Sequence, residues 1–113
     1  MAKVVTLRRQ RDFNRLFSTG KRYHHRLLVT VVCLRPGSDQ ARVAFISGTK
    51  VDKRAVVRNR VKRRLREAWR GELPDINSGV DVAFVAQSAA AEARFHELAT
   101  VMHQQLAEAG VLE

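Results

Sequence analysis

Residues 42–86 read RVAFISGTKVDKRAVVRNRVKRRLREAWRGELPDINSGVDVAFVA, with an apolar run at each end and a strongly basic segment between them. The end runs, RVAFIS at 42–47 and VDVAFVA at 80–86, are rich in β-branched and aliphatic residues and predict two strands. The basic segment predicts a helix over 58–70, because at about 100° per residue its apolar residues share one face: Val61, Leu65, Ala68 and Trp69. Such a β-α-β step normally joins two parallel strands through a right-handed crossover.

The sequence before this unit predicts a helix and a further strand. Asp12 can cap a short helix that runs to about Phe17, and Gly20 can end it. Residues 27–34, LLVTVVCL, predict a strand, and the turn residues at 35–39 favour a hairpin between it and 42–47.

The sequence after the unit predicts a long helix over 89–109, with Gly110 as its C-terminal cap. Its expected inward residues are Phe95, Leu98, Ala99, Met102 and Leu106. The predicted order is α-β-β-α-β-α, a small α+β fold of three or four strands with helices packed on the sheet. A chain of 113 residues that is 45% hydrophobic can bury a core, so residues 1–113 are expected to form a single domain.

Positive charge is concentrated in the first part of the chain. The formal net charge is +10, from 21 Lys and Arg against 11 Asp and Glu. Residues 1–70 carry 20 basic and 4 acidic side chains, a net charge of +16, whereas residues 71–113 carry 1 and 7, a net charge of −6. This excess predicts a polyanionic partner, either nucleic acid or an anionic membrane surface. The asymmetry predicts a basic docking face and an acidic back.

The sequence also bears on compartment and redox chemistry. No run approaches the roughly 18 apolar residues of a membrane-spanning helix, and Arg8 and Arg9 interrupt the apolar stretch that a secretory signal needs. The Arg-rich start is also typical of a mitochondrial transit peptide, although we expect a cytoplasmic protein. The single Cys33 excludes an intramolecular disulfide and is expected to be buried and inert.

The basic helix is the candidate nucleic-acid contact. A phosphate backbone needs closely spaced cations on a rigid support, which a helix provides, and arginine adds bidentate geometry. The alternative is a solvated charge run, but solvated helix faces usually mix signs, and Glu67 is the only acid between 58 and 70. Arg58 projects toward the apolar side, so its side chain has to reach around the helix.

The same segment resembles a known family. Arg58-Asn59-Arg60-Val61-Lys62-Arg63, followed by Leu65-Arg66-Glu67, resembles the signature of the bacterial ribonuclease P protein subunit. The start of the chain resembles that family too, in Leu7-Arg8, Asp12-Phe13, Phe17 and Gly20. The resemblance covers about residues 7–87 in matching order. One departure is Gly48-Thr49-Lys50, where family members often carry Ser-Lys-Lys.

The resemblance implies a fold and a function. The implied fold is like the second domain of ribosomal protein S5, with an unusual left-handed β-α-β crossover through the basic helix. The implied function is that of an accessory subunit of an endoribonuclease, which binds ribonuclease P RNA and precursor tRNA and assists removal of the 5′ leader. The RNA and its Mg²⁺ ions then perform the hydrolysis, and no membrane or obligate protein partner is expected.

The resemblance also implies site residues. The helix and the basic loop before it would contact the catalytic RNA through Lys50, Lys53, Arg54, Arg58, Asn59, Arg60, Lys62, Arg63, Arg64 and Arg66. The single-stranded leader would lie in a separate cleft against Phe13 and Phe17, with Arg9 beside them. On spacing alone, Phe13 and Phe17 at i, i+4 are typical core residues, and partial burial is compatible with base stacking.

The sequence predicts no catalytic or metal site in the protein itself. No Ser/His/Asp, Cys/His or paired-carboxylate arrangement is present. Glu92, His96 and His103 could share one helical face and hold a metal, but histidines at the solvent edge of a packed helix are the simpler interpretation. Two other functions stay open: a ribosomal-type RNA-binding protein, and a DNA-binding protein that uses 58–70 as a recognition helix. The strands on both sides of that helix disfavour the second.

Overall fold

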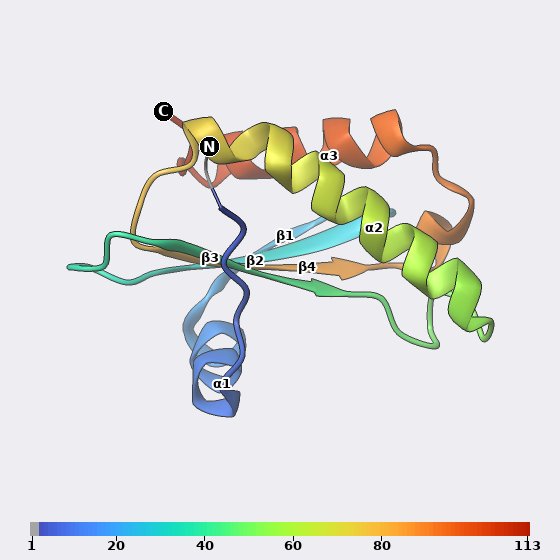
Figure 1. Cartoon of the computed structure of the whole chain (residues 1–113), viewed down its shortest axis with the longest axis horizontal. Helices are drawn as coiled ribbons and strands as arrows, with labels where there is room; N and C mark the ends of the chain where they lie inside the picture. Colours follow the sequence, from blue (N-terminus) through green and yellow to red (C-terminus); the bar gives the residue numbers. More distant parts are fainter. Residues whose placement is uncertain (1–2) are drawn as a thin grey trace.

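Helices cover both faces of one sheet in the computed structural model, which describes residues 3–113 (Figure 1). The strands are β1 (Lys21–His24), β2 (Leu28–Leu34), β3 (Ala41–Ile46) and β4 (Val80–Ala86). The helices are α1 (Gln10–Thr19), α2 (Ala55–Glu72) and α3 (Phe95–Glu108), with 3₁₀ turns at Leu73–Asp75 and Ser88–Glu92. α1 lies on one face of the sheet, and α2 and α3 lie side by side on the other. The predicted α+β class is confirmed.

The strand order is β1-β2-β4-β3, so the predicted hairpin between 27–34 and 42–47 is wrong. β4 lies between these two strands, with Val82 opposite Val32 in an antiparallel pair and opposite Val43 in a parallel pair. Six of the seven residues of β4 are buried. A strand whose side chains are apolar on both faces has to be buried on both faces, and the central position in this sheet provides that burial.

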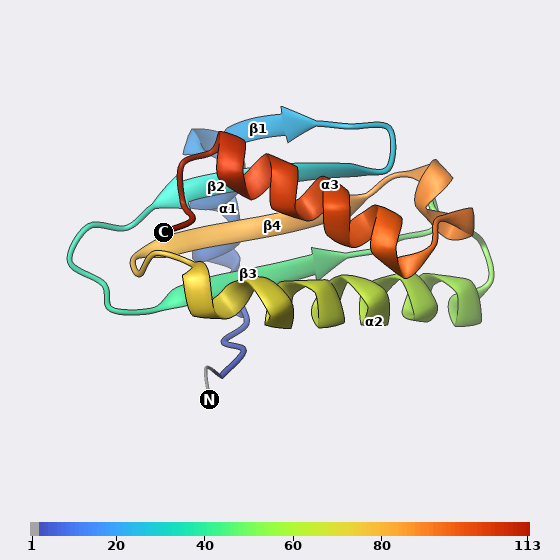
Figure 2. The same ribbon diagram turned by 90° about the horizontal axis from the view of Figure 1, so that it is seen from above.

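The connection from β3 through α2 to β4 is left-handed, so the right-handed default does not apply to this chain. β3 and β4 are parallel, and α2 lies in the nearer layer of Figure 2. When that view is turned until both arrows point upward, β4 lies to the left of β3. This course places α2 along the outer side of β3 and leaves the middle of the sheet to α3.

The N-terminal part of the fold differs from the prediction in two details. The four-residue strand β1 was not predicted, because Tyr23 is its only buried residue and its other side chains are polar and exposed. The element order is therefore α-β-β-β-α-β-α. α1 begins at Gln10 rather than after Asp12, whose carboxylate accepts a hydrogen bond from Arg42 instead of capping the helix.

The predicted helix over 89–109 is broken near its start. Ala93 and Arg94 are extended, so Ser88–Glu92 forms a separate 3₁₀ turn and α3 begins at Phe95. The Glu97 carboxylate accepts the Arg94 backbone N–H at 2.9 Å, which satisfies a free donor at this new helix start. Phe95 is therefore 45% exposed rather than inward, whereas the predicted core residues Leu98, Met102 and Leu106 are fully buried and Ala99 is partly buried.

Two apolar cores hold the layers together. The larger core lies between the sheet and α2 with α3, and includes Trp69 packed edge-on against Phe84. The smaller core lies under α1 and contains Leu7, Leu16 and Val31, with Phe13, Phe17 and a half-buried Cys33 at its margin. Within residues 3–113, no helix is long and apolar enough to cross a membrane.

Candidate nucleic-acid interface

α2 presents a row of cations on a rigid support. Its buried side chains recur at helical spacing, and four of them belong to the larger core between the sheet and the two helices: Val61, Leu65, Ala68 and Trp69. This anchoring fixes the opposite side of the helix toward solvent. We define the α2 outer surface as the exposed residues Lys53, Asn59, Lys62, Arg63 and Arg66. Nothing in residues 3–113 forms an ion pair with Lys53, Lys62, Arg63 or Arg66, so their charges are not neutralised within the described chain.

The start of α2 holds two of the predicted RNA-binding arginines by internal contacts. The Asp52 carboxylate accepts the Arg54 backbone N–H at 2.8 Å and the Arg54 Nε at 3.0 Å. These hydrogen bonds from Arg54 lower the pKa of Asp52 to about 2, so the carboxylate stays charged and offsets the Arg54 charge. Arg58 bends back and donates to the carbonyl oxygens of Asp52 and Lys53, at 3.2 and 2.7 Å, as its place on the helix required.

Arg60 and Arg64 are also occupied within the fold. Arg60 donates to the Ala91 carbonyl at 3.3 Å, and Arg64 donates to the Ala93 carbonyl at 2.7 Å. Both side chains are half-buried and tie α2 to the segment just before α3. Lys50 similarly donates to the Gln87 side-chain oxygen at 2.9 Å. The predicted contact residues therefore form two groups. The side chains of the first group donate hydrogen bonds within the protein, and those of the second make up the α2 outer surface.

A groove joins the two predicted binding regions. It has a volume of about 280 Å³ and is lined by Thr6, Phe13, Ile46, Lys62 and Arg66, among others. Phe13 comes from α1 and the two cations from α2, so the groove crosses the edge of β3. The Arg66 guanidinium lies 5.7 Å from the centre of the Phe45 ring. We call this hollow the Phe13 groove; sequence spacing could not reveal it, because its walls are far apart in the chain.

Phe17 and Arg9 do not line the Phe13 groove. Phe17 is half-buried beside the smaller core, with the Arg22 guanidinium 5.6 Å from its ring centre. Arg22 also donates to the Phe17 carbonyl at 2.9 Å. Arg9 lines a neighbouring pocket together with Lys3 and Arg8. The three predicted leader-binding residues thus lie on α1 or directly before it, in three different surroundings.

The histidines of α3 do not form a metal site with their neighbours within residues 3–113. His103 Nδ1 lies 2.9 Å from Glu72 Oε1, at the end of α2. Over the described part of the chain, no group of three or more His, Cys, Asp or Glu side chains could hold a metal ion. The arrangement as a whole is suited to binding a polyanion along α2 and to holding a planar group against Phe13.

Comparison with known proteins gives consistent matches. A family model described as Ribonuclease P matches residues 1–110. The Ribonuclease P protein component of Cyanothece sp. is 33% identical over 127 residues, covering 99% of this chain and 97% of that protein. The protein of the same name from Caldanaerobacter subterraneus is 38% identical over 96 residues, covering 85% of this chain and 81% of that protein.

Two solved structures share the fold. The Staphylococcus aureus RNase P protein superposes with a TM-score of 0.86 at 23% identity, covering 98% of this chain and 100% of that one. The Thermotoga maritima RNase P protein has a TM-score of 0.78 at 25% identity, covering 89% of this chain and 94% of that one. The predicted likeness to the second domain of ribosomal protein S5 stays a prediction.

Proposed function

Because this chain belongs to the ribonuclease P protein family, we propose that it binds the catalytic RNA and the 5′ leader of precursor tRNA and assists removal of the leader. The family assignment makes it a subunit of a nuclease complex that processes tRNA.

The observation that carries the proposal is the α2 outer surface. Lys62, Arg63 and Arg66 are exposed and have no acidic partner in residues 3–113, although five arginine–carboxylate ion pairs form elsewhere in the described fold. Crowding unpaired cations on one helix destabilises the free protein, and a phosphate backbone removes that repulsion. The catalytic RNA is the polyanion that we assign to this surface.

The Phe13 groove is our candidate for the leader. An unpaired base can stack on the half-buried Phe13 ring, because every base has a π-face. Lys62 and Arg66 then stand where they can contact the phosphates of the same strand. These two cations were predicted to contact only the catalytic RNA, and their position in the groove favours a second role toward the substrate.

In this proposal, the protein supplies charge and the RNA supplies chemistry. The hydrolysis belongs to the catalytic RNA and its Mg²⁺ ions, for which we assign no ligands in the protein. Cations between the two RNAs reduce phosphate repulsion, so less Mg²⁺ is needed for the RNAs to associate. Five further residues remain predicted RNA contacts: Lys50, Arg54, Arg58, Arg60 and Arg64. Each side chain already donates a hydrogen bond within the protein, and to bind RNA it would have to give up that partner or share it.

The test is cleavage of a 5′-labelled precursor tRNA by bacterial ribonuclease P RNA at low Mg²⁺, with and without the protein. We expect the protein to restore cleavage at the mature 5′ end. A Lys62→Gln/Arg63→Gln variant should restore less, whereas Lys21→Gln/Arg26→Gln, with the same charge loss near the opposite edge of the sheet, should act like the unmodified protein. Equal activity with and without protein would contradict the proposal.

A further inference from the structure

A buried carboxylate lies on the central strand of the sheet, on the face that α1 covers. Asp81 of β4 is 2% exposed, and the next residue on the same face of that strand, Ala83, belongs to the smaller core under α1. Within residues 3–113, Asp81 is the one charged side chain that is buried. Removing a charge from water is costly, so this carboxylate requires partners.

Two arginines hold Asp81, one from each side of β4. Arg35, directly after β2, donates Nε to the carboxylate at 2.7 Å. Arg42, on β3 and in register with Asp81, donates Nε at 2.9 Å and a terminal nitrogen at 2.8 Å. Because Arg42 binds both carboxylate oxygens, the orientation of its planar guanidinium is fixed relative to the sheet.

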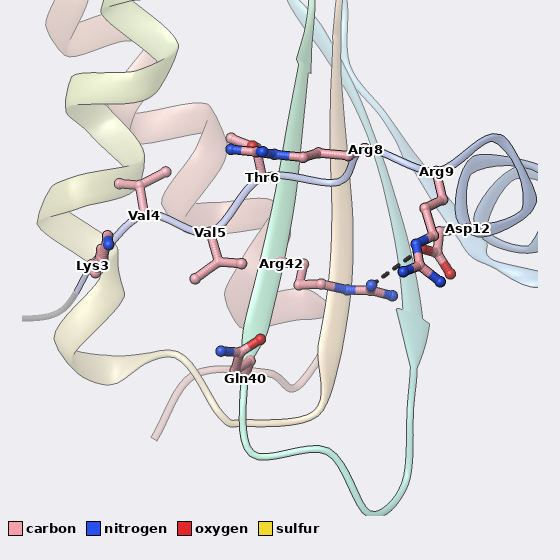
Figure 3. A pocket seen from close by; sticks show the side chains of 9 residues that line it. All are labelled: Lys3, Val4, Val5, Thr6, Arg8, Arg9, Asp12, Gln40 and Arg42. Carbon is pink, nitrogen blue, oxygen red and sulfur yellow. Dashed lines mark hydrogen bonds and ion pairs between the residues drawn. The ribbon is translucent and has the colours of Figure 1, made fainter.

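The other terminal nitrogen of Arg42 reaches the start of α1. It donates to the carboxylate of Asp12, in the first turn of the helix, at 3.2 Å (Figure 3). Among the described residues, no other side-chain hydrogen bond joins this first turn to the sheet. The far end of α1 is held separately, by the buried Leu16 and the close approach of Gly20 to β2. Asp12 directly precedes Phe13, so the ion pair lies next to the residue that lines the groove.

We propose that Asp81 and Arg42 are positioning residues, which act through Asp12 to fix where the first turn of α1, and with it the Phe13 ring, lies over the sheet. The opposite wall of the Phe13 groove belongs to α2, so the opening of the groove depends on the placement of α1. Asp12, Arg35, Arg42 and Asp81 together carry no net charge, so the network itself does not attract RNA. The role of Phe13 toward the leader rests on the proposed function, whereas the placement of α1 rests on these contacts alone.

A stabilising role alone does not account for the contact with Asp12. Asp81 already has two arginine partners, and a buried ion pair adds little net stability. The Arg42 and Asp12 side chains are 19% and 16% exposed, and such an outer pair also adds little. What the pair supplies is direction, because a rigid guanidinium that is held on one acid presents its remaining nitrogen at a fixed place.

Two substitutions break the Arg42–Asp12 ion pair from its two sides. Asp12→Asn removes the carboxylate, whereas Arg42→Lys keeps the charge but replaces the fork with a compact ammonium that cannot bridge both acids. Each should lower the ratio of precursor to mature tRNA affinity of the assembled complex by about three- to fivefold, a part of one base–aromatic stack. Binding of catalytic RNA should stay unchanged. The double variant should lose no more than either single one, because both remove the same contact.

A purely electrostatic role for Asp12 predicts the opposite sign. Loss of a carboxylate near the groove would raise the affinity for a leader, and added salt would abolish that gain. A positioning role predicts a loss that persists at higher salt and disappears in a Phe13→Leu background, where the ring that α1 places is already gone. Asp39→Asn, at an exposed acid without an ion pair in residues 3–113, is the charge-matched control and should keep the ratio of the unmodified protein. A raised ratio in Asp12→Asn, or an equal further loss in the Phe13→Leu background, would overturn the proposal.

Hydrogen exchange of the protein without RNA tests the network separately from the proposed function. The Asp12 and Phe13 amides donate to the Arg9 carbonyl at 3.0 and 3.2 Å, and the Gly20 amide donates at the far end of α1 at 2.8 Å. In Arg42→Lys, the two first-turn amides should lose protection while the Gly20 amide keeps it. Folded Asp81→Asn should show the same pattern, because it frees the Arg42 guanidinium from the sheet.

The two possible failures give different results. Unchanged first-turn protection in Arg42→Lys would show that the network does not place α1, whatever the RNA measurements give. If the unmodified complex binds precursor and mature tRNA equally, the leader assignment of the proposed function fails, and the exchange result still decides whether Asp81 and Arg42 position the helix.

Discussion

Neighbouring arginines on α2 have different roles, because one makes contacts within the protein and the other is free to bind a partner. Arg64 donates to the Ala93 carbonyl at 2.7 Å and is half-buried, whereas Arg63, one residue earlier, is exposed. Both belong to the same basic run, and both were predicted to contact RNA. The difference arises because residue 64 faces the segment before α3 and residue 63 faces solvent.

Arg64→Ala should therefore destabilise the free protein. The substitution leaves a carbonyl at a buried residue without its charged donor, which costs about 1–3 kcal/mol of unfolding free energy. Arg63→Ala, the matched control, should change it by less than about 0.5 kcal/mol. Urea denaturation measures both; equal losses would show that the Ala93 contact does not support the fold.

Asp52 makes the start of α2 sensitive to acid. Hydrogen bonds from Arg54 lower its pKa from 3.8 to about 2 in the folded protein. A lowered folded-state pKa stabilises the fold above pH 3.8, and that contribution disappears as the pH falls toward about 2. The contribution is small, because the pair is exposed.

Titration of the Asp52 carboxyl by NMR should give a midpoint near 2, and Arg54→Gln should move it upward toward 3.8. The stability difference between the unmodified protein and Asp52→Asn should shrink over the same pH range. A midpoint that Arg54→Gln leaves in place would show that another group lowers this pKa.

At the scale of elements, the contact between α1 and the sheet depends on Gly20. Its backbone is ordinary, with φ −71°, but an added Cβ would lie 2.4 Å from the Leu16 carbonyl oxygen and 2.8 Å from Val31 Cγ1. Close approach, rather than backbone conformation, requires glycine here.

Gly20→Ala should lower the unfolding free energy by about 1–3 kcal/mol, because α1 has to shift from β2. Gly48→Ala is the control, since an added Cβ there meets nothing within 4 Å. Because the shift moves Phe13, Gly20→Ala should also weaken the preference for precursor over mature tRNA. A stable Gly20→Ala protein would contradict this packing.

Element types were predictable from the sequence, but their pairing was not. The β-branched and aliphatic composition of 80–86 indicated β4 with its true bounds, and the periodicity of apolar residues indicated the body of α2 within a few residues. Strand neighbours depend on contacts between distant segments, so the position of β4 between β2 and β3 left no local signal. The break before α3 had one weak signal, Glu97 three residues after Arg94.

The candidate site residues came from the family resemblance, and their arrangement in space was not predictable from the sequence. The resemblance singled out Phe13 and the cations of α2, and the structure brings Phe13, Lys62 and Arg66 into one groove. The bonds from Arg60 and Arg64 to backbone carbonyls were not predictable, since a carbonyl partner has no signature in the sequence.

The whole molecule carries a net charge of +10, so its positive side chains repel one another in the folded state. Phosphate or sulfate should raise the unfolding midpoint more than chloride does at equal ionic strength, because multivalent anions bind the folded cation clusters. Arg8→Gln/Arg9→Gln should lose part of this gain and Lys21→Gln/Arg26→Gln less of it. Thermal melts in matched salts measure the effect; identical midpoints in all anions would exclude folded anion sites.

The central claim is that one chain binds two RNAs on two adjoining surfaces that share Lys62 and Arg66: catalytic RNA on the α2 outer surface and the leader in the Phe13 groove. Two variants separate them, Arg63→Gln on the outer surface and Phe13→Leu in the groove, the latter keeping an apolar side chain of similar size without the π-face.

The most direct measurement is the affinity of each variant for catalytic RNA, together with the affinity of each assembled complex for precursor and mature tRNA. We predict that Arg63→Gln weakens binding of catalytic RNA and leaves the precursor-to-mature ratio unchanged. Phe13→Leu should leave binding of catalytic RNA unchanged and lower that ratio by at least about fivefold, the scale of one base–aromatic stack. The same pattern of losses in both variants would contradict the assignment of different RNAs to Arg63 and Phe13.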